Sequence, residues 1–212
     1  MSVRVAVIDY GAGNILNLAR ALAHLGVDYD VLTIPPGNPA DYSHVVLPGV
    51  GSFQFGMHSL RARGLDDFLL AWEHAQQPIL GICLGMHLLA DIGFEGGEAE
   101  GLGIIPGTVN RINVQTVADS NVRLPHVGWA RVQPVDNTEP SGVNRPGRAW
   151  DAYFTHSYHF EPDSARAVTA WVEFGKTRLV ASVRTGHVSG FQFHPEKSGA
   201  NGLTRIGSWL RS

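Results

Sequence analysis

The first half of the chain alternates between short apolar runs and stretches with helical spacing. Apolar runs rich in β-branched side chains occupy residues 3–8, 29–33, 44–47 and 79–82. Such runs are typical of buried strands in a parallel sheet. After the first run, apolar positions from Ile15 to Leu25 fall on one helical face, and Gly26 is expected to end this helix. A second helix is predicted within residues 60–75, and the alternation predicts helices on both faces of a parallel sheet.

The second half of the chain has mostly β-type patterns. Strands are predicted at residues 108–112, 131–135, 152–160, 168–174, 178–184 and 188–193. Residues 136–149, rich in Pro, Gly and Asn, are expected to form an exposed loop, and residues 203–210 a last helix. No repeat or linker divides the chain, so residues 1–212 are expected to form one domain. The predicted fold class is α/β, with three α/β/α layers, a largely parallel central sheet and additional β-strands in the second half.

Composition and charge exclude several classes of protein. The 212 residues are 44% hydrophobic and 17% charged, as in an ordinary soluble globular protein. A net charge of −3 leaves no basic footprint and argues against a nucleic-acid partner. No apolar segment has the length that spans a membrane, and the N-terminus shows no signal-peptide pattern. The single cysteine cannot form an internal disulfide and fits a reducing compartment, so we expect a cytoplasmic protein.

That single cysteine, Cys83, lies between Gly81 and Gly85. An apolar run at residues 79–82 precedes it, and a helix-like stretch at residues 86–90 follows. A strand, a sharp turn and a helix with the nucleophile at the turn form a nucleophile elbow. The glycines leave room beside the nucleophile, and the N–H groups at the helix N-terminus favour a thiolate. The pattern therefore indicates a reactive thiol.

A catalytic thiol needs a base, and the base needs an orienting partner. Among ten histidines, His194 follows the apolar run at residues 188–193, where a parallel sheet would place it beside Cys83. Pro195 ends the strand, and Glu196 can turn back toward the imidazole. Each of these residues alone has an ordinary structural explanation. Together, Cys83, His194 and Glu196 predict a catalytic triad.

Further motifs accompany the triad in a fixed order. They are Asp-Tyr-Gly-Ala-Gly-Asn at residues 9–14, Pro-Gly-Val-Gly-Ser-Phe at 48–53, Gly-Ile-Cys-Leu-Gly-Met at 81–86, Pro-His-Val-Gly-Trp at 125–129, His-Ser-Tyr at 156–158 and His-Pro-Glu-Lys-Ser at 194–198. This ordered set resembles the class I glutamine amidotransferases, and most closely their HisH family, the glutaminase subunits of imidazole glycerol phosphate synthase. The resemblance covers essentially the whole chain. It implies hydrolysis of glutamine to glutamate and ammonia through a thioester on Cys83, with no cofactor and no metal.

The resemblance also implies roles for individual positions. His194 would protonate the leaving ammonia and then activate water, while Glu196 orients its ring. The oxyanion hole would use backbone donors from Leu84 and from the stretch with Val50 and Gly51, which in the family is thought to rotate a peptide before it donates. Glu95 would face the α-amino group of glutamine. The implied substrate-binding residues are Gly49, His87, Glu95, His156, Ser157 and Tyr158.

A partner is implied as well. Asn14, Trp129 and Lys197 resemble positions at the interface with a HisF-like (β/α)8 cyclase subunit, which would form a heterodimer with this chain. Ammonia would pass along a sealed path to the cyclase, which would convert a phosphoribulosyl formimino aminoimidazole carboxamide ribotide (PRFAR) into imidazole glycerol phosphate and an aminoimidazole ribotide (AICAR). This reaction belongs to histidine biosynthesis. For Trp129, the alternative is an aromatic residue of the core.

Two positions depart from the family pattern and keep alternatives open. His87 replaces the usual Gln, and Ala130 replaces the usual Asn. They leave room for a paralogue that supplies ammonia to another synthase, such as one that amidinates a surface sugar. A non-catalytic subunit with this fold is another alternative, against which the intact triad argues. A histidine-rich metal protein is disfavoured, because the histidines lack ligand spacing around a second cysteine. The histidines concerned are His44, His58, His74 and His126.

Overall fold

The computed structural model describes residues 3–113, 123–135 and 148–211. Most of the loop predicted at residues 136–149 therefore lies outside the described residues. Within the described part of the chain, no helix is long and apolar enough to cross a membrane.

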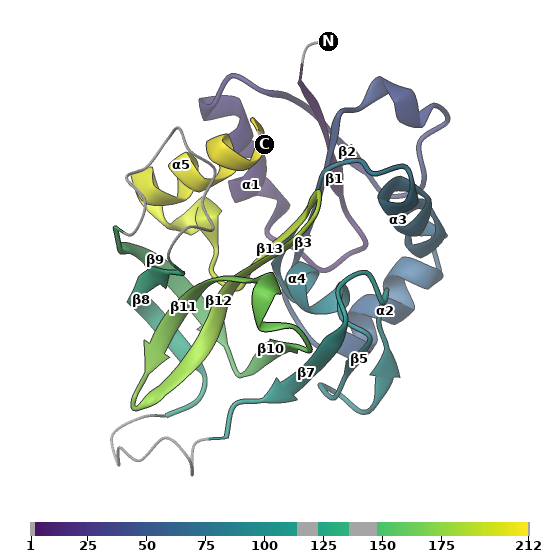
Figure 1. Cartoon of the computed structure of the whole chain (residues 1–212). Coiled ribbons are helices and arrows are strands. Elements are labelled where there is room, and N and C mark those ends of the chain that lie inside the picture. The colour runs from purple at the N-terminus through teal and green to yellow at the C-terminus, as the bar shows by residue number, and fades with distance from the viewer. Residues whose placement is uncertain (1–2, 114–122, 136–147, 212) are drawn as a thin grey trace.

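Strands and helices alternate through the first half of the chain, as the sequence predicts (Figure 1). The elements are β1 (Arg4–Ile8), α1 (Ile15–His24), β2 (Asp28–Leu32), the 3-10 turn η1 (Pro39–Asp41), β3 (His44–Gly49), α2 (Phe53–Arg61), α3 (Leu65–His74), β4 (Ile79–Cys83) and α4 (Leu84–Leu88). Helix α2 was not predicted, because Gly56 weakens its helical pattern. The glycine serves packing, since a Cβ at this position would lie 3.1 Å from Leu88 Cδ2.

The second half is dominated by strands. They are β5 (Ile92–Gly93), β6 (Ala99–Glu100), β7 (Gly107–Arg111), β8 (His126–Pro134), β9 (Trp150–His156), β10 (Tyr158–Pro162), β11 (Val168–Phe174), β12 (Thr177–Thr185) and β13 (Val188–Phe191), with the 3-10 turns η2 (Ala165–Ala167) and η3 (Pro195–Lys197) and the helix α5 (Gly199–Trp209). The single strand predicted at residues 152–160 was wrong. The chain leaves one sheet at Ser157 and enters another, and a β-type residue pattern does not reveal such a change. Strands β5 and β6 are too short to leave a pattern, and α5 begins before residue 203.

The central sheet is mixed. Within the described residues, its nine strands lie in the order β2-β1-β3-β4-β13-β12-β11-β8-β9. The pairs from β2 to β13 are parallel, and those from β13 to β9 are antiparallel. A second sheet has the order β10-β7-β5-β6. The predicted α/β class, with a parallel sheet in the first half and additional strands later, is confirmed.

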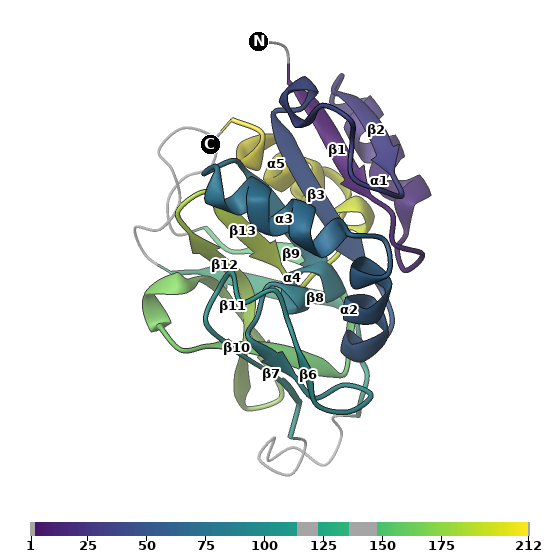
Figure 2. The same cartoon turned by 90° about the vertical axis from the view of Figure 1, so that its right-hand side faces the viewer.

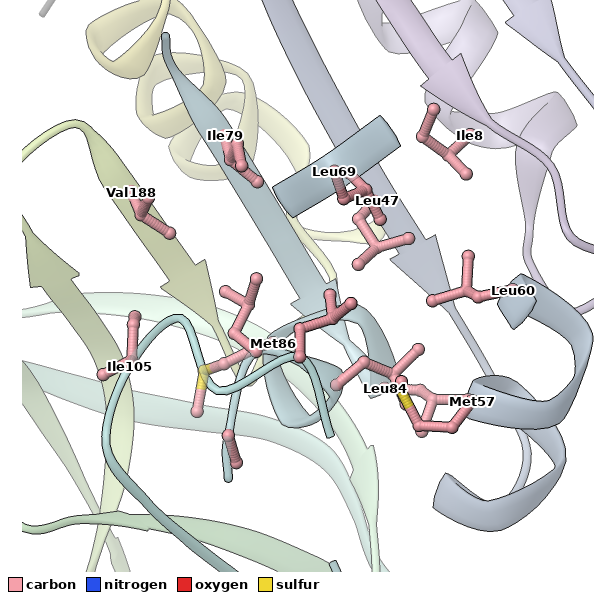
Figure 3. Close-up of a cluster of buried hydrophobic side chains, with 14 of the residues drawn as sticks. Ile8, Leu47, Met57, Leu60, Leu69, Ile79, Leu84, Met86, Ile105 and Val188 are labelled. Atoms are coloured by element: carbon pink, nitrogen blue, oxygen red, sulfur yellow. The ribbon is translucent and has the colours of Figure 1, made fainter. Parts of the chain in front are cut away.

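Helices cover both faces of the parallel part of the sheet (Figures 1 and 2). Helices α2 and α3 pack on one face, and α1 and α5 pack on the other. Figure 3 shows the core on the α2–α3 side, where Met57, Leu60 and Leu69 meet strand residues. Leu84 and Met86 of α4 are buried in the same cluster. This burial anchors the short helix that follows Cys83.

The carboxyl ends of β3, β4 and β13 meet at one edge of the sheet. Gly49 at the end of β3 is paired with Cys83 at the end of β4. Strand β13, the other neighbour of β4, runs parallel to it. The segments that follow these three strands therefore converge at the edge where open α/β sheets bind their ligands.

Candidate active site

Cys83 lies at a sharp turn between β4 and α4. Its backbone has φ 54° and ψ −110°, which is strained for a residue with a side chain. The flanking glycines have no room for side chains. A Cβ at Gly81 would lie 2.7 Å from the carbonyl oxygen of Gly85, and one at Gly85 would overlap the carbonyl oxygen of Leu47. The predicted strand, turn and helix are thus present, and tight packing holds the thiol at the sheet edge.

His194 and Glu196 follow β13 at the same edge. His194 Nδ1 donates a hydrogen bond to Glu196 Oε1 over 2.8 Å, and both side chains are almost fully buried. The backbone N–H of His194 donates to the carbonyl oxygen of Tyr153 over 2.9 Å, which ties this segment to β9. Because β13 and β4 are parallel neighbours, Cys83 at the end of β4 and His194 just past the end of β13 lie at the same edge of the sheet.

The surroundings of His194 favour its protonated form. Burial by itself lowers the pKa of His194, but interactions with Cys83 and Glu196 outweigh burial and raise it to about 10. The second ring nitrogen, Nε2, is buried without a hydrogen-bond partner among the described residues. The effect of Cys83 on the pKa of His194 indicates that the thiol lies near the ring. Nε2 and Sγ nevertheless form no hydrogen bond in this structure. Nε2 is available to exchange a proton with the sulfur or with a bound molecule.

A cavity of about 400 Å³ opens beside Cys83. Its walls consist of Val50, Gly51, Ser52, Cys83, Leu84, His87, Glu95, Pro125, Thr155, His156, Ser157 and Tyr158. The structure thus brings together all the residues expected at the oxyanion hole and around glutamine except Gly49, which lies against the Tyr10 hydroxyl behind the wall. Burial raises the pKa of Glu95 on this wall. The sequence motifs did not point to Pro125 or Thr155 as parts of the cavity.

His87 is linked to Cys83 through a residue that the sequence did not identify. His87 Nε2 donates to Gln192 Oε1 over 2.7 Å, and Gln192 Nε2 lies 3.9 Å from Cys83 Sγ. Burial lowers the pKa of His87 to about 4, so the ring is neutral at pH 7 and does not compete with His194 as a base. Gln192 lies two positions before His194. The alternation of side chains along an extended segment was the available signal.

His126 and His156 form a hydrogen-bonded pair that supports the cavity wall. His156 Nδ1 donates to the carbonyl oxygen of Tyr158 over 2.8 Å, and its Nε2 accepts from His126 Nδ1 over 3.0 Å. The His126 ring stacks on Phe154, with ring centroids 4.9 Å apart. Burial lowers the pKa of both histidines. Two neutral rings thus hold the wall segment at residues 155–158.

The two backbone N–H groups that are expected to bind an oxyanion, those of Leu84 and Val50, differ in their surroundings. Leu84 begins α4 directly after Cys83 and lines the cavity. The N–H of Val50 instead donates to the carbonyl oxygen of Ala12 over 3.2 Å, and Ala12 is not part of the cavity wall. Gly51 follows with φ 107°, a conformation that favours glycine. The Val50 donor is therefore occupied outside the cavity.

The residues expected at a partner interface lie at the protein surface or near it. Trp129 is 60% exposed, so its alternative role as a core aromatic was wrong. Its ring meets that of Tyr153 edge-on at 6.3 Å, and Lys197 Nζ lies 5.6 Å from the centre of the Tyr153 ring. Asn14 immediately precedes α1, and its side chain makes no cap hydrogen bond. Trp129 and Lys197 thus share one aromatic ring, on which an incoming surface can rest.

Residues 3–113, 123–135 and 148–211 contain no candidate metal site. No group of three or more His, Cys, Asp or Glu side chains there is arranged to hold a metal ion. The His126–His156 contact is a hydrogen-bonded pair.

Comparison with known proteins identifies the class. The profile of the family described as "Glutamine amidotransferase class-I" matches residues 6–206. The fold resembles PurLQS from Thermotoga maritima, with a TM-score of 0.76 at 19% identity over 100% of this chain and 99% of that chain. It also resembles a structure described as glutamine amidotransferase, with a TM-score of 0.72 at 21% identity over 97% of each chain. The chain belongs to the class I glutamine amidotransferases.

Curated relatives narrow this assignment. The chain is 39% identical over 209 residues to imidazole glycerol phosphate synthase subunit HisH of Synechococcus sp. (strain JA-2-3B'a(2-13)), covering 99% of this chain and 93% of the relative. It is 43% identical over 198 residues to the HisH subunit of Carboxydothermus hydrogenoformans, covering 92% and 93%. Within its class, the chain is therefore a member of the HisH family, the glutaminase subunits of imidazole glycerol phosphate synthase. The resemblance found in the sequence motifs is confirmed.

Proposed function

We propose that residues 1–212 act as one amidotransferase domain that hydrolyses glutamine at Cys83. The observation that carries this proposal is the position of the strained Cys83 turn on the cavity wall, beside a buried His194 whose Nδ1 donates to Glu196 over 2.8 Å. The thiol supplies the nucleophile, the imidazole carries the proton and the carboxylate orients the ring. The lone cysteine fits a cytoplasmic location, where thiols stay reduced.

The chemistry proceeds in two steps. The Cys83 thiol has given its proton to His194, so its thiolate sulfur forms a bond to the side-chain amide carbon of glutamine, and the C–N bond breaks while His194 gives that proton to the leaving nitrogen. The products are a γ-glutamyl thioester and ammonia. Neutral His194 then takes a proton from water, whose oxygen attacks the thioester carbon, and the C–S bond breaks to release glutamate. A pKa of about 10 keeps His194 protonated before the first step.

The oxyanion of each step requires preorganised donors. We propose that Leu84 N–H supplies one, which is supported by its position at the start of α4 on the cavity wall. Val50 N–H is engaged with Ala12 in this structure, so the Gly49–Val50 peptide must rotate before Val50 can donate into the cavity. Glycine on both sides of Val50 makes such a rotation inexpensive. We propose that the structure represents the resting state, with the oxyanion hole incomplete.

The cavity wall provides groups for both ends of glutamine. We propose that Glu95 binds the α-amino group and that the segment of His156, Ser157 and Tyr158 binds the other polar atoms of the substrate, which is supported by their position on the cavity wall. Gly49 contributes backbone alone, because Tyr10 and Leu84 leave no space for a side chain there. A volume of about 400 Å³ suits a small polar molecule.

The proposed role of His87 is to hold Gln192 beside the thiol. We expect His87→Gln to keep glutamine turnover within about threefold of the parent, because an amide N–H can also donate to Gln192 Oε1. His87→Ala leaves that buried oxygen unpaired, which costs about 1–3 kcal/mol of stability. Glutaminase assays and thermal unfolding of both variants provide the measurement. A collapse of turnover in His87→Gln would show that the imidazole has a task that an amide cannot perform.

We further propose that the ammonia passes to a HisF-like (β/α)8 cyclase subunit in a heterodimer, where PRFAR becomes imidazole glycerol phosphate and AICAR. The HisH family assignment supports this partner. Exposed apolar side chains also support a docking surface, with Trp129 at 60% and Val127 at 55% exposure on β8. Asn14, Trp129 and Lys197 are the proposed contact residues.

Partner dependence is tested by assaying glutamate release with and without a cyclase subunit and its nucleotide. The isolated chain is expected to turn over glutamine slowly, because Val50 is engaged with Ala12. Adding the cyclase and PRFAR should raise the rate by about 5- to 150-fold, the usual range for coupling between two sites. An unchanged rate would contradict activation by this cyclase and would favour another synthase as partner.

A further inference from the structure

Tyr10 lies behind the cavity with an unusual hydroxyl group. Its side chain is 1% exposed, and its Oη has no hydrogen-bond partner among the described residues. Burial, with smaller contributions from the nearby Cys83 and Asp9, raises the pKa of Tyr10, so the hydroxyl keeps its proton and remains a donor. A buried hydroxyl without a partner costs free energy in a folded protein. Its retention here points to a state in which it is paired.

The hydroxyl lies against the strand that must rearrange. A Cβ at Gly49 would overlap Tyr10 Oη and would lie 2.9 Å from Leu84 Cβ. Gly49 is the residue paired with Cys83 in the sheet. The turn that follows Tyr10 also holds the next peptide, because the carbonyl oxygen of Ala12 accepts from Val50 N–H over 3.2 Å. Both ends of this short turn therefore contact the Gly49–Val50 peptide.

Rotation of that peptide creates a need for a donor. Its N–H and C=O groups point in opposite directions, so turning Val50 N–H into the cavity moves the Gly49 carbonyl oxygen toward Ala12. Two carbonyl oxygens would then face each other without a proton between them. The N–H of Gly11 is already engaged by Asp9 Oδ1 over 2.9 Å. The Tyr10 hydroxyl has no partner among residues 3–113, 123–135 and 148–211, and it is already in contact with Gly49.

We propose that Tyr10 is a positioning residue whose hydroxyl donates a hydrogen bond to the Gly49 carbonyl oxygen when the Gly49–Val50 peptide rotates, and so stabilises the competent oxyanion hole. In the resting state the hydroxyl is unpaired, and in the rotated state it is paired. The hydrogen bond thereby lowers the free energy of the rotated state relative to the resting state. This inference rests on the proposed glutaminase function.

The test is Tyr10→Phe, which removes the hydroxyl and keeps the ring. Loss of one hydrogen bond in the rotated state should lower kcat for glutamine in the isolated chain by about tenfold, with KM unchanged. The loss should be smaller in the complex with cyclase and nucleotide, where the partner already favours the rotated state. The thermal unfolding temperature should stay the same or rise, because an unpaired buried hydroxyl has been removed from the resting state.

Tyr42→Phe serves as the matched control. Tyr42 precedes β3 at the opposite end of that strand from Gly49, and its loss of a hydroxyl should leave kcat and KM unchanged. An unchanged kcat in Tyr10→Phe would overturn the inference, and so would a lower unfolding temperature together with a raised KM. Different outcomes would contradict the proposed function itself. They are a parent chain that does not turn over glutamine, or a Cys83→Ala variant that still does.

Discussion

Replacing Cys83 by alanine is expected to abolish glutamine hydrolysis in the complex with cyclase and nucleotide. The cavity then has no nucleophile for the amide carbon, and the loss should be about 10⁴-fold or more, as for the removal of other catalytic triad nucleophiles. The measurement is glutamate release under saturating glutamine. Glutamine binding, followed by calorimetry, should persist, because Glu95 and the 156–158 segment remain in the cavity wall.

A second substitution at the same position separates chemistry from folding. Cys83 has φ 54°, a conformation that strains alanine as it strains cysteine but suits glycine. Cys83→Gly should therefore be as inactive as Cys83→Ala, yet more stable by about 1 kcal/mol. Full turnover in either variant would refute Cys83 as the nucleophile. Inactivity with loss of glutamine binding in both would instead point to a damaged cavity.

The chain is expected to lose much of its stability as the pH falls from about 6.5 to 4. Burial lowers the pKa of His87 and of His126 to about 4, and that of His156 well below its usual value of 6.5. In this window the unfolded chain binds protons that the folded chain does not bind, so acid favours unfolding. His87 alone contributes roughly 3 kcal/mol, a large share of the roughly 5–15 kcal/mol that stabilises a typical domain.

His194 acts in the opposite direction. Its pKa is raised to about 10, so its contribution to stability is fully present below pH 6.5 and is lost as the pH rises toward 10. Deprotonation of His194 therefore lowers the stability of the fold at alkaline pH. The loss of stability at acid pH comes from the other buried histidines. We expect the greatest stability near neutral pH.

Urea unfolding at pH 7.5, 6.5, 5.5 and 4.5, followed by tryptophan fluorescence, measures this dependence. His126→Gln keeps a donor for His156 but removes one titrating ring, so the slope below pH 6.5 should be shallower than in the parent. His24→Gln at the exposed end of α1 is the matched control and should leave the slope unchanged. A parent stability that stays level between pH 6.5 and 4.5 would contradict the prediction.

The candidate site divides into features that were readable in the sequence and features that were not. The Cys83 turn depends on residues within one strand, turn and helix, and the His194–Glu196 contact joins positions two apart. Both are local, so residue types and spacing were sufficient to predict them. Gln192 was missed because its contact with His87 joins residues 105 positions apart. Only the pairing of β13 with β4 brings the two together.

The same distinction explains the corrections. Trp129 was ambiguous because its strand places it at the surface or in the core according to which face is covered, and the neighbouring strands decide that. The run at residues 152–160 has a continuous β-type pattern, yet the chain changes sheets at Ser157 because β9 pairs with β8 while β10 pairs with β7. Hydrophobic patterns report burial, and they do not report the partner strand.

The sequence by itself determined the alternating α/β plan, the strained thiol turn, its base and orienting carboxylate, and the family to which the chain belongs. These features follow from short-range backbone preferences and from the order of local motifs. The tertiary structure decided which side chains surround the thiol, which histidines are buried and neutral, and that Val50 N–H donates to Ala12 while the Tyr10 hydroxyl has no partner in the described part of the chain. The reason is that burial, and hydrogen bonding between distant segments, depend on the order of the strands in the sheet. That order is determined jointly by residues that lie far apart along the chain.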